Sequence, residues 1–183
     1  MNVWAPGALG STDATHVRWD MAPYMEAVHY TGKEGFPFIA YEVTVDHIGR
    51  VLGVAAGFPG AKNDKTMIRF DKLITKIRSK DQYTQLEYTL VDAEGTEYVQ
   101  RGAYVIVDGG YHMAYLPLLA NSRGCKQRNW NDQLESVHKD VEFFFGRIKS
   151  HWRILKLPLQ VHMREVIDEI FITCYILHFM LHT

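Results

Sequence analysis

The chain has 183 residues, a length that accommodates one domain or a domain with a small appendage. Hydrophobic residues make up 47% of it and charged residues 22%, a composition that excludes a disordered chain. The 20 lysines and arginines face 21 acids, and the net charge of −1 excludes a bulk cationic nucleic-acid binder. Any nucleic-acid surface must therefore be local.

The two cysteines and the apolar segments indicate a protein of the cell interior. Cys125 and Cys174 form neither a zinc pattern nor a disulfide framework, which fits a reducing compartment. Residues 1–10 lack the basic and apolar parts of a signal peptide. The longest apolar run, 170–181, is shorter than the roughly 20 residues that a bilayer span needs. We expect a soluble chain, neither secreted nor bound to a membrane.

The first part of the chain predicts three strands, over Leu9–Trp19, Phe36–Val45 and Val51–Phe58. The last two are separated by residues 46–49, an Asp-first, Gly-last turn, and therefore form a hairpin.

A helix is predicted next, from Asn63 and Asp64, which are good capping residues, to about Ser79. Its expected buried face consists of Met67, Phe70, Ile74 and Ile77. Residues 86–91 and 96–100 then form a hairpin around a loop that ends in glycine. Because this hairpin lies between the helix and the next core strand, it is interpreted as an insertion.

The second half predicts one buried strand and two helices. Ala103–Val107 is a continuous apolar run typical of a central strand, and it ends at Asp108. Residues 120–130 are expected to be a polar loop, followed by helices over 132–150 and 162–182. This order of elements predicts an α/β fold, a mixed sheet flanked by helices.

Three carboxylates occupy positions at which packing of a hydrophobic core does not explain a charged side chain. Asp13 lies inside a predicted strand, Asp108 ends the most buried strand, and Glu142 lies on the helix 132–150. Carboxylates that converge at a sheet edge need a cation to offset their repulsion, and a hard divalent ion would supply it. A simpler reading remains open: Asp108 is a turn residue, and Glu142 pairs on the helix surface with Lys139. Asp46 and Asp64 are alternative candidates for this site. A role as a turn residue explains Asp46, and a role as a helix cap explains Asp64.

Several motifs, taken together and in this order, resemble the PIF/Harbinger transposase family, in particular the "plant transposon protein" branch of the DDE superfamily endonucleases. They are Gly10–Asp13 (GSTD) with His16 and Trp19, Asn63-Asp64 after Pro59-Gly60, Tyr104–Tyr111 (YVIVDGGY), Lys139–Glu142 (KDVE) with Phe145-Gly146, Trp152–Leu155 (WRIL), and Ile176–His178 with Met180. The resemblance covers nearly the whole chain.

The resemblance implies a ribonuclease-H-like fold whose three acids cut DNA with two divalent ions, Mg²⁺ or Mn²⁺. By this resemblance the catalytic and metal-binding acids are Asp13, Asp108 and Glu142. The hairpin at 86–100 then precedes the fourth core strand as an insertion. His16 and Asp64 are candidates for side chains that support the metal ligands or the substrate phosphate.

Family members differ from this chain in ways that bear on function. His138 and Phe143 stand where they often carry Arg, and Phe179 stands where Asn is usual. The resemblance implies that residues 1–183 form the endonuclease domain alone, without the upstream helix-turn-helix region. It also implies a nuclear location (otherwise cytoplasmic) and allows an oligomer and a Myb-like DNA-binding protein as partner. The alternative to an active nuclease is a catalytically silent, domesticated transposase that acts as a protein-interaction adaptor.

Two further patterns leave alternatives open. Residues 121–156 carry eight basic and four acidic side chains, which predicts either a DNA-backbone contact or a solvated helix face. The candidate DNA-binding residues are Lys139, Arg147, Lys149 and Arg153. His178 and His182 have the i, i+4 spacing of a metal pair, but no third ligand is evident and a buried core histidine is favoured.

Overall fold

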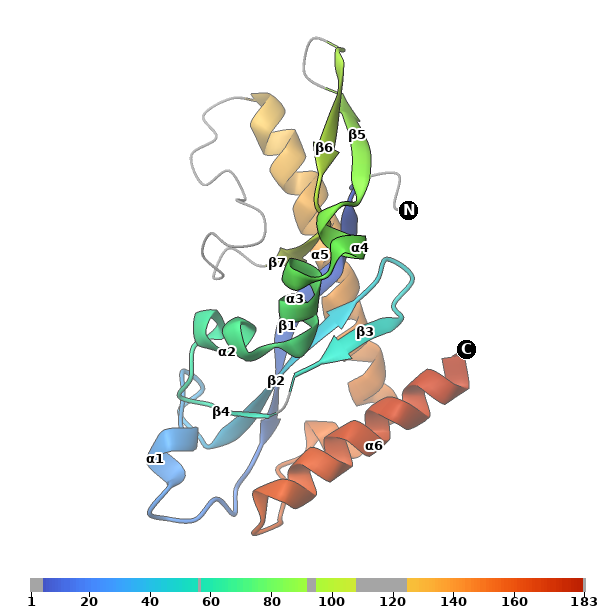
Figure 1. Ribbon diagram of the computed structural model, residues 1–183. Coiled ribbons are helices and arrows are strands. Elements are labelled where there is room, and N and C mark those ends of the chain that lie inside the picture. Colours follow the sequence, from blue (N-terminus) through green and yellow to red (C-terminus); the bar gives the residue numbers. More distant parts are fainter. Residues whose placement is uncertain (1–4, 56, 92–94, 108–124, 183) are drawn as a thin grey trace.

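The computed structural model describes residues 5–55, 57–91, 95–107 and 125–182, with the backbone alone at 64–65, 125–134 and 182 (Figure 1). Its strands are β1 (Ala8–Arg18), β2 (Phe38–Val45), β3 (Val51–Val54), β4 (Phe58–Pro59), β5 (Glu87–Val91), β6 (Glu97–Arg101) and β7 (Tyr104–Val107). Its helices are α1 (Ala27–Tyr30), α2 (Asp64–Phe70), α3 (Lys72–Ser79), α4 (Asp81–Thr84), α5 (Cys125–His151), the 3-10 turn η1 (Arg153–Lys156) and α6 (Arg164–His182).

The main sheet is built around β1, in the order β3-β2-β1-β7 with β4 also paired to β2. β1 runs antiparallel to β2, from the pair Ser11–Val45 to the pair Arg18–Phe38. It runs parallel to β7, whose pairing with β1 ends at Thr12 and Val107. All eight residues of β2 are buried, because this strand lies in the middle of the sheet and is covered on both faces.

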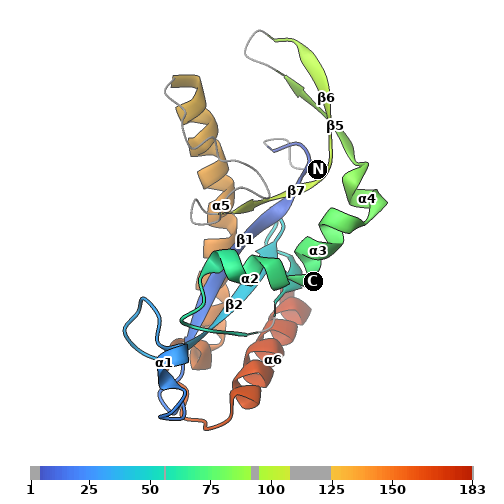
Figure 2. The same cartoon turned by 60° about the vertical axis from the view of Figure 1, so that its left-hand side comes forward.

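Helices cover both faces of the sheet, which gives three layers (Figure 2). On one face, Val141 and Phe144 of α5 and Phe171 of α6 pack with Val17 and Tyr41 in the largest core cluster. On the other face, Met67 of α2 packs with Phe38 and Ala40, and Ile74 and Ile77 of α3 pack with Val105 and Val107.

This arrangement confirms the predicted mixed α/β sheet with flanking helices and is consistent with a ribonuclease-H-like fold. β5 and β6 pair only with each other among the described strands, in a separate two-stranded sheet directly before β7. The hairpin is therefore an insertion, as predicted, and Figure 1 shows it projecting from the end of the molecule.

The single helix predicted from residue 64 to 79 is wrong, because the chain breaks at Asp71 into α2 and α3. Asp71 is extended (φ −69°, ψ 120°), and its Oδ1 accepts hydrogen bonds from the backbone N–H groups of Leu73 and Ile74. The break changes the direction of the chain at the end of α2. Phe70, which was predicted to be buried, is therefore 63% exposed.

The predicted loop over 120–130 is also wrong from residue 125 onward, where α5 already begins. Lys126, Gln127 and Arg128 are good helix formers, and polarity by itself does not stop a helix. The third predicted strand is divided into β3 and β4, which pair separately with β2. The sequence did not predict α1, α4 and η1, because one-turn helices have no apolar period.

No helix in the described ranges combines the length and the apolar character needed to cross a bilayer.

Candidate active site

Asp13 lies in β1 on the face of the sheet that α5 covers. Two residues earlier, the Ser11 hydroxyl donates to the Val137 carbonyl of α5 over 2.9 Å, and four residues later Val17 packs against the same helix. Because side chains alternate along a strand, Asp13 shares this face. It is partly buried, and its Oδ1 accepts a 2.7 Å hydrogen bond from the Ala14 N–H.

Asp108 lies outside the described residues, but the strand that leads to it is described. All four residues of β7 are buried. The parallel register pairs Thr12 with Val107, and these residues directly precede Asp13 and Asp108 in the sequence. The chain therefore approaches both acids along neighbouring strands that run in the same direction.

Glu142 is an exposed residue of α5. Two contacts align this helix with β1: Ser11 meets Val137, and the Lys149 ammonium donates to the His16 carbonyl over 3.0 Å. Five residues of helix beyond Val137 advance about 7.5 Å, and two residues of strand beyond Ser11 advance about 6.6 Å. Glu142 is therefore about level with Asp13.

The same flank of α5 carries both Glu142 and Lys149, because seven residues are close to two full turns. Lys149 contacts the edge of β1 beyond the point where the described part of β7 ends. Glu142 thus lies on the side of α5 toward that edge.

His16 and Asp64, predicted to support the site, are placed elsewhere. The His16 ring lies 4.2 Å from the Phe38 ring, between centroids, and its Nδ1 is 3.4 Å from Glu34 Oε1. These contacts are on the face opposite to Asp13, as expected for a residue three positions away in a strand. Asp64 is the first residue of α2, which also packs on that opposite face.

The basic residues of α5 do not form one surface. Arg147 and Lys149 are two positions apart, about 200° around the helix. Arg147 lies against Gly49 in the turn between β2 and β3, where a Cβ on that glycine would come within 2.6 Å of a guanidinium nitrogen. Lys149 faces β1 instead, and burial, together with the nearby Lys156, lowers the pKa of its ammonium. Lys139 and Arg153 are exposed.

Among the described side chains, no group of three or more His, Cys, Asp or Glu residues could hold a metal ion. Of the three predicted acids, Asp13 and Glu142 are described, and their carboxylates are the oxygen donors that Mg²⁺ and Mn²⁺ prefer. The donor chemistry of these two residues fits a hard divalent ion.

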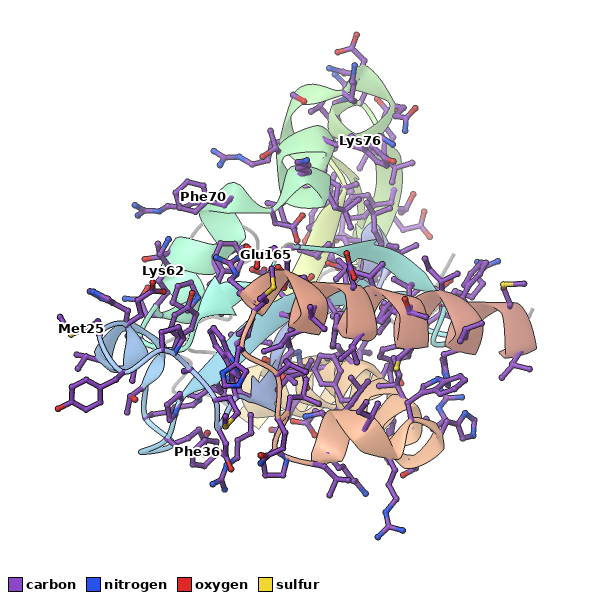
Figure 3. The ribbon with its side chains drawn as sticks, turned by 90° about the horizontal axis from the view of Figure 1, so that it is seen from below. Met25, Phe36, Lys62, Phe70, Lys76 and Glu165 are labelled. Carbon is purple, nitrogen blue, oxygen red and sulfur yellow. The ribbon has the colours of Figure 1, made fainter. Side chains whose placement is uncertain are left out.

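A cavity of about 470 Å³ that the sequence did not predict lies between the sheet, α2 and α6. Tyr41 and Asp168 line it, joined by a 2.5 Å hydrogen bond from the tyrosine hydroxyl to Oδ1. Lys62 and Phe70 form its rim, with the ammonium 5.3 Å from the ring centre, and Figure 3 shows both on the same side of the molecule. No short motif connects these four residues, because they come from separate segments of the chain.

Comparisons with known proteins agree with the predicted family. Residues 12–178 match the family described as DDE superfamily endonuclease. The chain is 25% identical over 182 residues to "Protein ALP1-like" of Arabidopsis thaliana, a match that covers 94% of this chain and 42% of that protein.

The chain thus spans less than half the length of this plant relative, and no solved structure matches it. The similarity supports the narrower resemblance to the PIF/Harbinger branch. Because the family match extends over most of the sequence and includes all three predicted acids, this protein belongs to the DDE superfamily endonucleases.

Proposed function

We propose that this chain is a transposase-derived endonuclease domain that cleaves DNA phosphodiester bonds with two Mg²⁺ or Mn²⁺ ions held by Asp13, Asp108 and Glu142. The observation that carries the proposal is the parallel register of β1 and β7, in which Thr12 and Val107 are partners. We expect two acids that directly follow paired residues of parallel strands to start from neighbouring backbone positions. The choice of Glu142 as the third acid is supported by its position along α5, which is about level with Asp13.

The three acids have separate roles in this proposal. Bound divalent ions lower the pKa of a water and stabilise the leaving oxygen of the phosphodiester. Asp13 and Asp108 would share the ions from the sheet, with Asp13 oriented by its bond to the Ala14 N–H. Glu142 would complete the ligand set from α5 and orient the attacking water.

The DNA backbone would contact exposed basic residues of α5 and η1. Lys139 and Arg153 are exposed on α5 and η1 and are the better candidates. Arg147 faces the β2–β3 turn, and the Lys149 ammonium donates a hydrogen bond to the backbone of β1. A DNA substrate implies action in the nucleus, and a Myb-like DNA-binding protein and self-association remain part of the proposal.

Calorimetric titration with Mn²⁺ tests whether the acids assemble. The folded chain should bind Mn²⁺, and Asp108→Asn should abolish this binding while leaving the circular dichroism spectrum unchanged. Mn²⁺ affinity that is equal in the two proteins would contradict the assignment of Asp108. Titration is a better first test than DNA cleavage, because cleavage also requires the correct DNA substrate.

Asp140→Asn is a matched control for Glu142→Gln, since both acids belong to α5. Asp140 faces the turn at His47 and Gly49, and burial raises the pKa of its carboxyl group. Glu142→Gln should weaken Mn²⁺ binding about tenfold or more, and Asp140→Asn should leave it unchanged. If Asp140→Asn weakened Mn²⁺ binding and Glu142→Gln did not, the third metal ligand would be Asp140, and the assignment of Glu142 would be wrong.

A second candidate function, a catalytically silent adaptor, is favoured by one observation. The last turns of α6 expose apolar side chains: Ile176, Leu177, Phe179, Met180 and Leu181. An apolar patch of this kind is typical of a protein-interaction surface. A folded chain that binds no Mn²⁺, and that loses a partner when Leu177 and Met180 are replaced by serine, would favour the adaptor over the nuclease.

A further inference from the structure

Two imidazoles from different helices meet where α5 ends. His151 is the last residue of α5, and His178 lies 27 positions further along the chain, in α6. Their Nδ1 atoms are 3.3 Å apart, and their ring centroids are 5.2 Å apart. The two rings therefore point at each other through the same nitrogen.

These two distances match a pair of histidine ligands on one tetrahedral ion. With Zn–N bonds of about 2.05 Å and a tetrahedral angle, two ligand nitrogens are separated by about 3.3 Å. Each ring centre lies about 1.15 Å behind its nitrogen, so the same geometry places the centroids about 5.2 Å apart. A direct hydrogen bond between the two rings is the competing explanation for the 3.3 Å contact, and the Zn²⁺ titration described below distinguishes the two.

The surroundings suit a borderline metal better than a hard one. His178 is only 5% exposed, and the Phe144 ring packs edge-on against it with centroids 5.5 Å apart. His151 is exposed, so an ion can reach the pair from solvent. Neutral imidazole nitrogen in a partly apolar setting selects Zn²⁺ and similar ions over Mg²⁺, which prefers oxygen.

We propose that His151 and His178 form a binding site for a divalent transition-metal ion such as Zn²⁺, which would crosslink the end of α5 to α6. Among the described side chains no third His, Cys, Asp or Glu joins these two in a metal-binding group, so water molecules would complete the coordination.

This site is independent of the acids proposed for catalysis. His151 follows Glu142 by nine residues, about 13 Å along α5, and its ligand chemistry is nitrogen rather than oxygen. Mg²⁺ at millimolar concentration should therefore occupy the acids without displacing Zn²⁺ from the histidines.

Calorimetric titration with Zn²⁺ in millimolar Mg²⁺ tests the proposal on the full chain. One Zn²⁺ should bind per chain, and His151→Ala should weaken binding about tenfold or more. His151 is exposed, so this substitution should leave the fold intact, unlike a change at the buried His178. His162→Ala removes another exposed histidine and should have no effect, and Asp108→Asn should also retain Zn²⁺ binding.

Co²⁺ supplies a second readout, because a tetrahedral site gives it intense visible absorption. Wild-type protein with Co²⁺ should show this absorption, and His151→Ala should lose it. Failure of the folded wild-type chain to bind Zn²⁺, or equal affinity in His151→Ala, would overturn the proposal and leave a hydrogen-bonded histidine pair. Neither result would alter the outcome of the Mn²⁺ titration. The proposal of a histidine site and the proposal of a catalytic acid site can therefore be disproved independently.

Discussion

Asp71 shows how a single buried carboxylate shapes the layer of helices. It is 2% exposed, and its Oδ1 accepts the Leu73 N–H over 2.6 Å and the Ile74 N–H over 3.3 Å. These bonds satisfy donors at the first turn of α3 that would otherwise be unpaired. Burial has the larger effect on this carboxyl group and raises its pKa, whereas the two backbone hydrogen bonds lower it.

The raised pKa predicts a specific dependence of stability on pH. A group whose folded pKa lies above its unfolded value stabilises the fold below the unfolded pKa of about 3.9, and this contribution is lost as pH rises through the folded pKa. Asp71→Asn keeps a capping oxygen but does not titrate. The free energy of unfolding of the wild type should therefore fall relative to that of Asp71→Asn as pH increases from 4 to 7.

Urea unfolding at several pH values checks this, with Asp71→Ala as the control that removes the cap. The alanine variant should lose about 1–2 kcal/mol at neutral pH. Parallel pH curves for the wild type and Asp71→Asn would show that burial does not perturb this carboxyl group.

At the scale of elements, the β5–β6 hairpin is the part least connected to the core. Every residue of β6 is exposed. On β5, Tyr88 packs against Gly7 and has its ring 6.1 Å from that of Tyr104, between centroids. The base of the hairpin therefore contacts the sheet, whereas the tip is a separate two-stranded unit.

Shortening the hairpin should consequently be tolerated. Thr89 and Val99 are partners in the register, so replacing residues 90–98 by Asn-Gly closes the two strands with a short turn. The thermal midpoint should change by only a few degrees, because little buried apolar area is removed. Tyr88→Ala, which removes the contact with Tyr104, should lower it more. Loss of the cooperative transition in the shortened chain would mean that the tip contributes to the core.

At the scale of the whole molecule, Trp19 connects the first strand to the segment that precedes the last helix. Its indole Nε1 donates to the Val161 carbonyl over 2.6 Å, and the Leu159 N–H donates to the Arg18 carbonyl over 2.9 Å. The indole is 1% exposed and packs edge-on against Tyr30. The segment before α6 is thereby attached to the end of β1.

Trp19→Phe should cost about 2–4 kcal/mol, since it removes the indole donor, leaves a partly buried carbonyl without that bond and opens a cavity. Trp152→Phe is the matched control, because the Trp152 Nε1 is buried without a hydrogen-bond partner among the described residues. That change should cost less, and denaturant unfolding of both variants measures the difference. Equal losses would show that volume, and not the bond to Val161, determines the effect.

The sequence alone determined the features that depend on near neighbours. The long strands, the hairpin insertion and the buried face of α3 follow from apolar spacing, which local geometry controls. The order of motifs was enough to identify the family. The break at Asp71 was missed because an Asp inside an apolar period reads as a surface residue until its burial is known.

Only the tertiary structure decided which distant residues meet. The register of β1 with β7 depends on long-range pairing, and the level of Glu142 depends on how α5 packs across β1. Likewise, spacing along one helix could suggest only His178 and His182, whereas chain folding brought His151 to His178. Local periodicity specifies the face on which a side chain lies. Its partner across the fold is selected by packing of the whole chain.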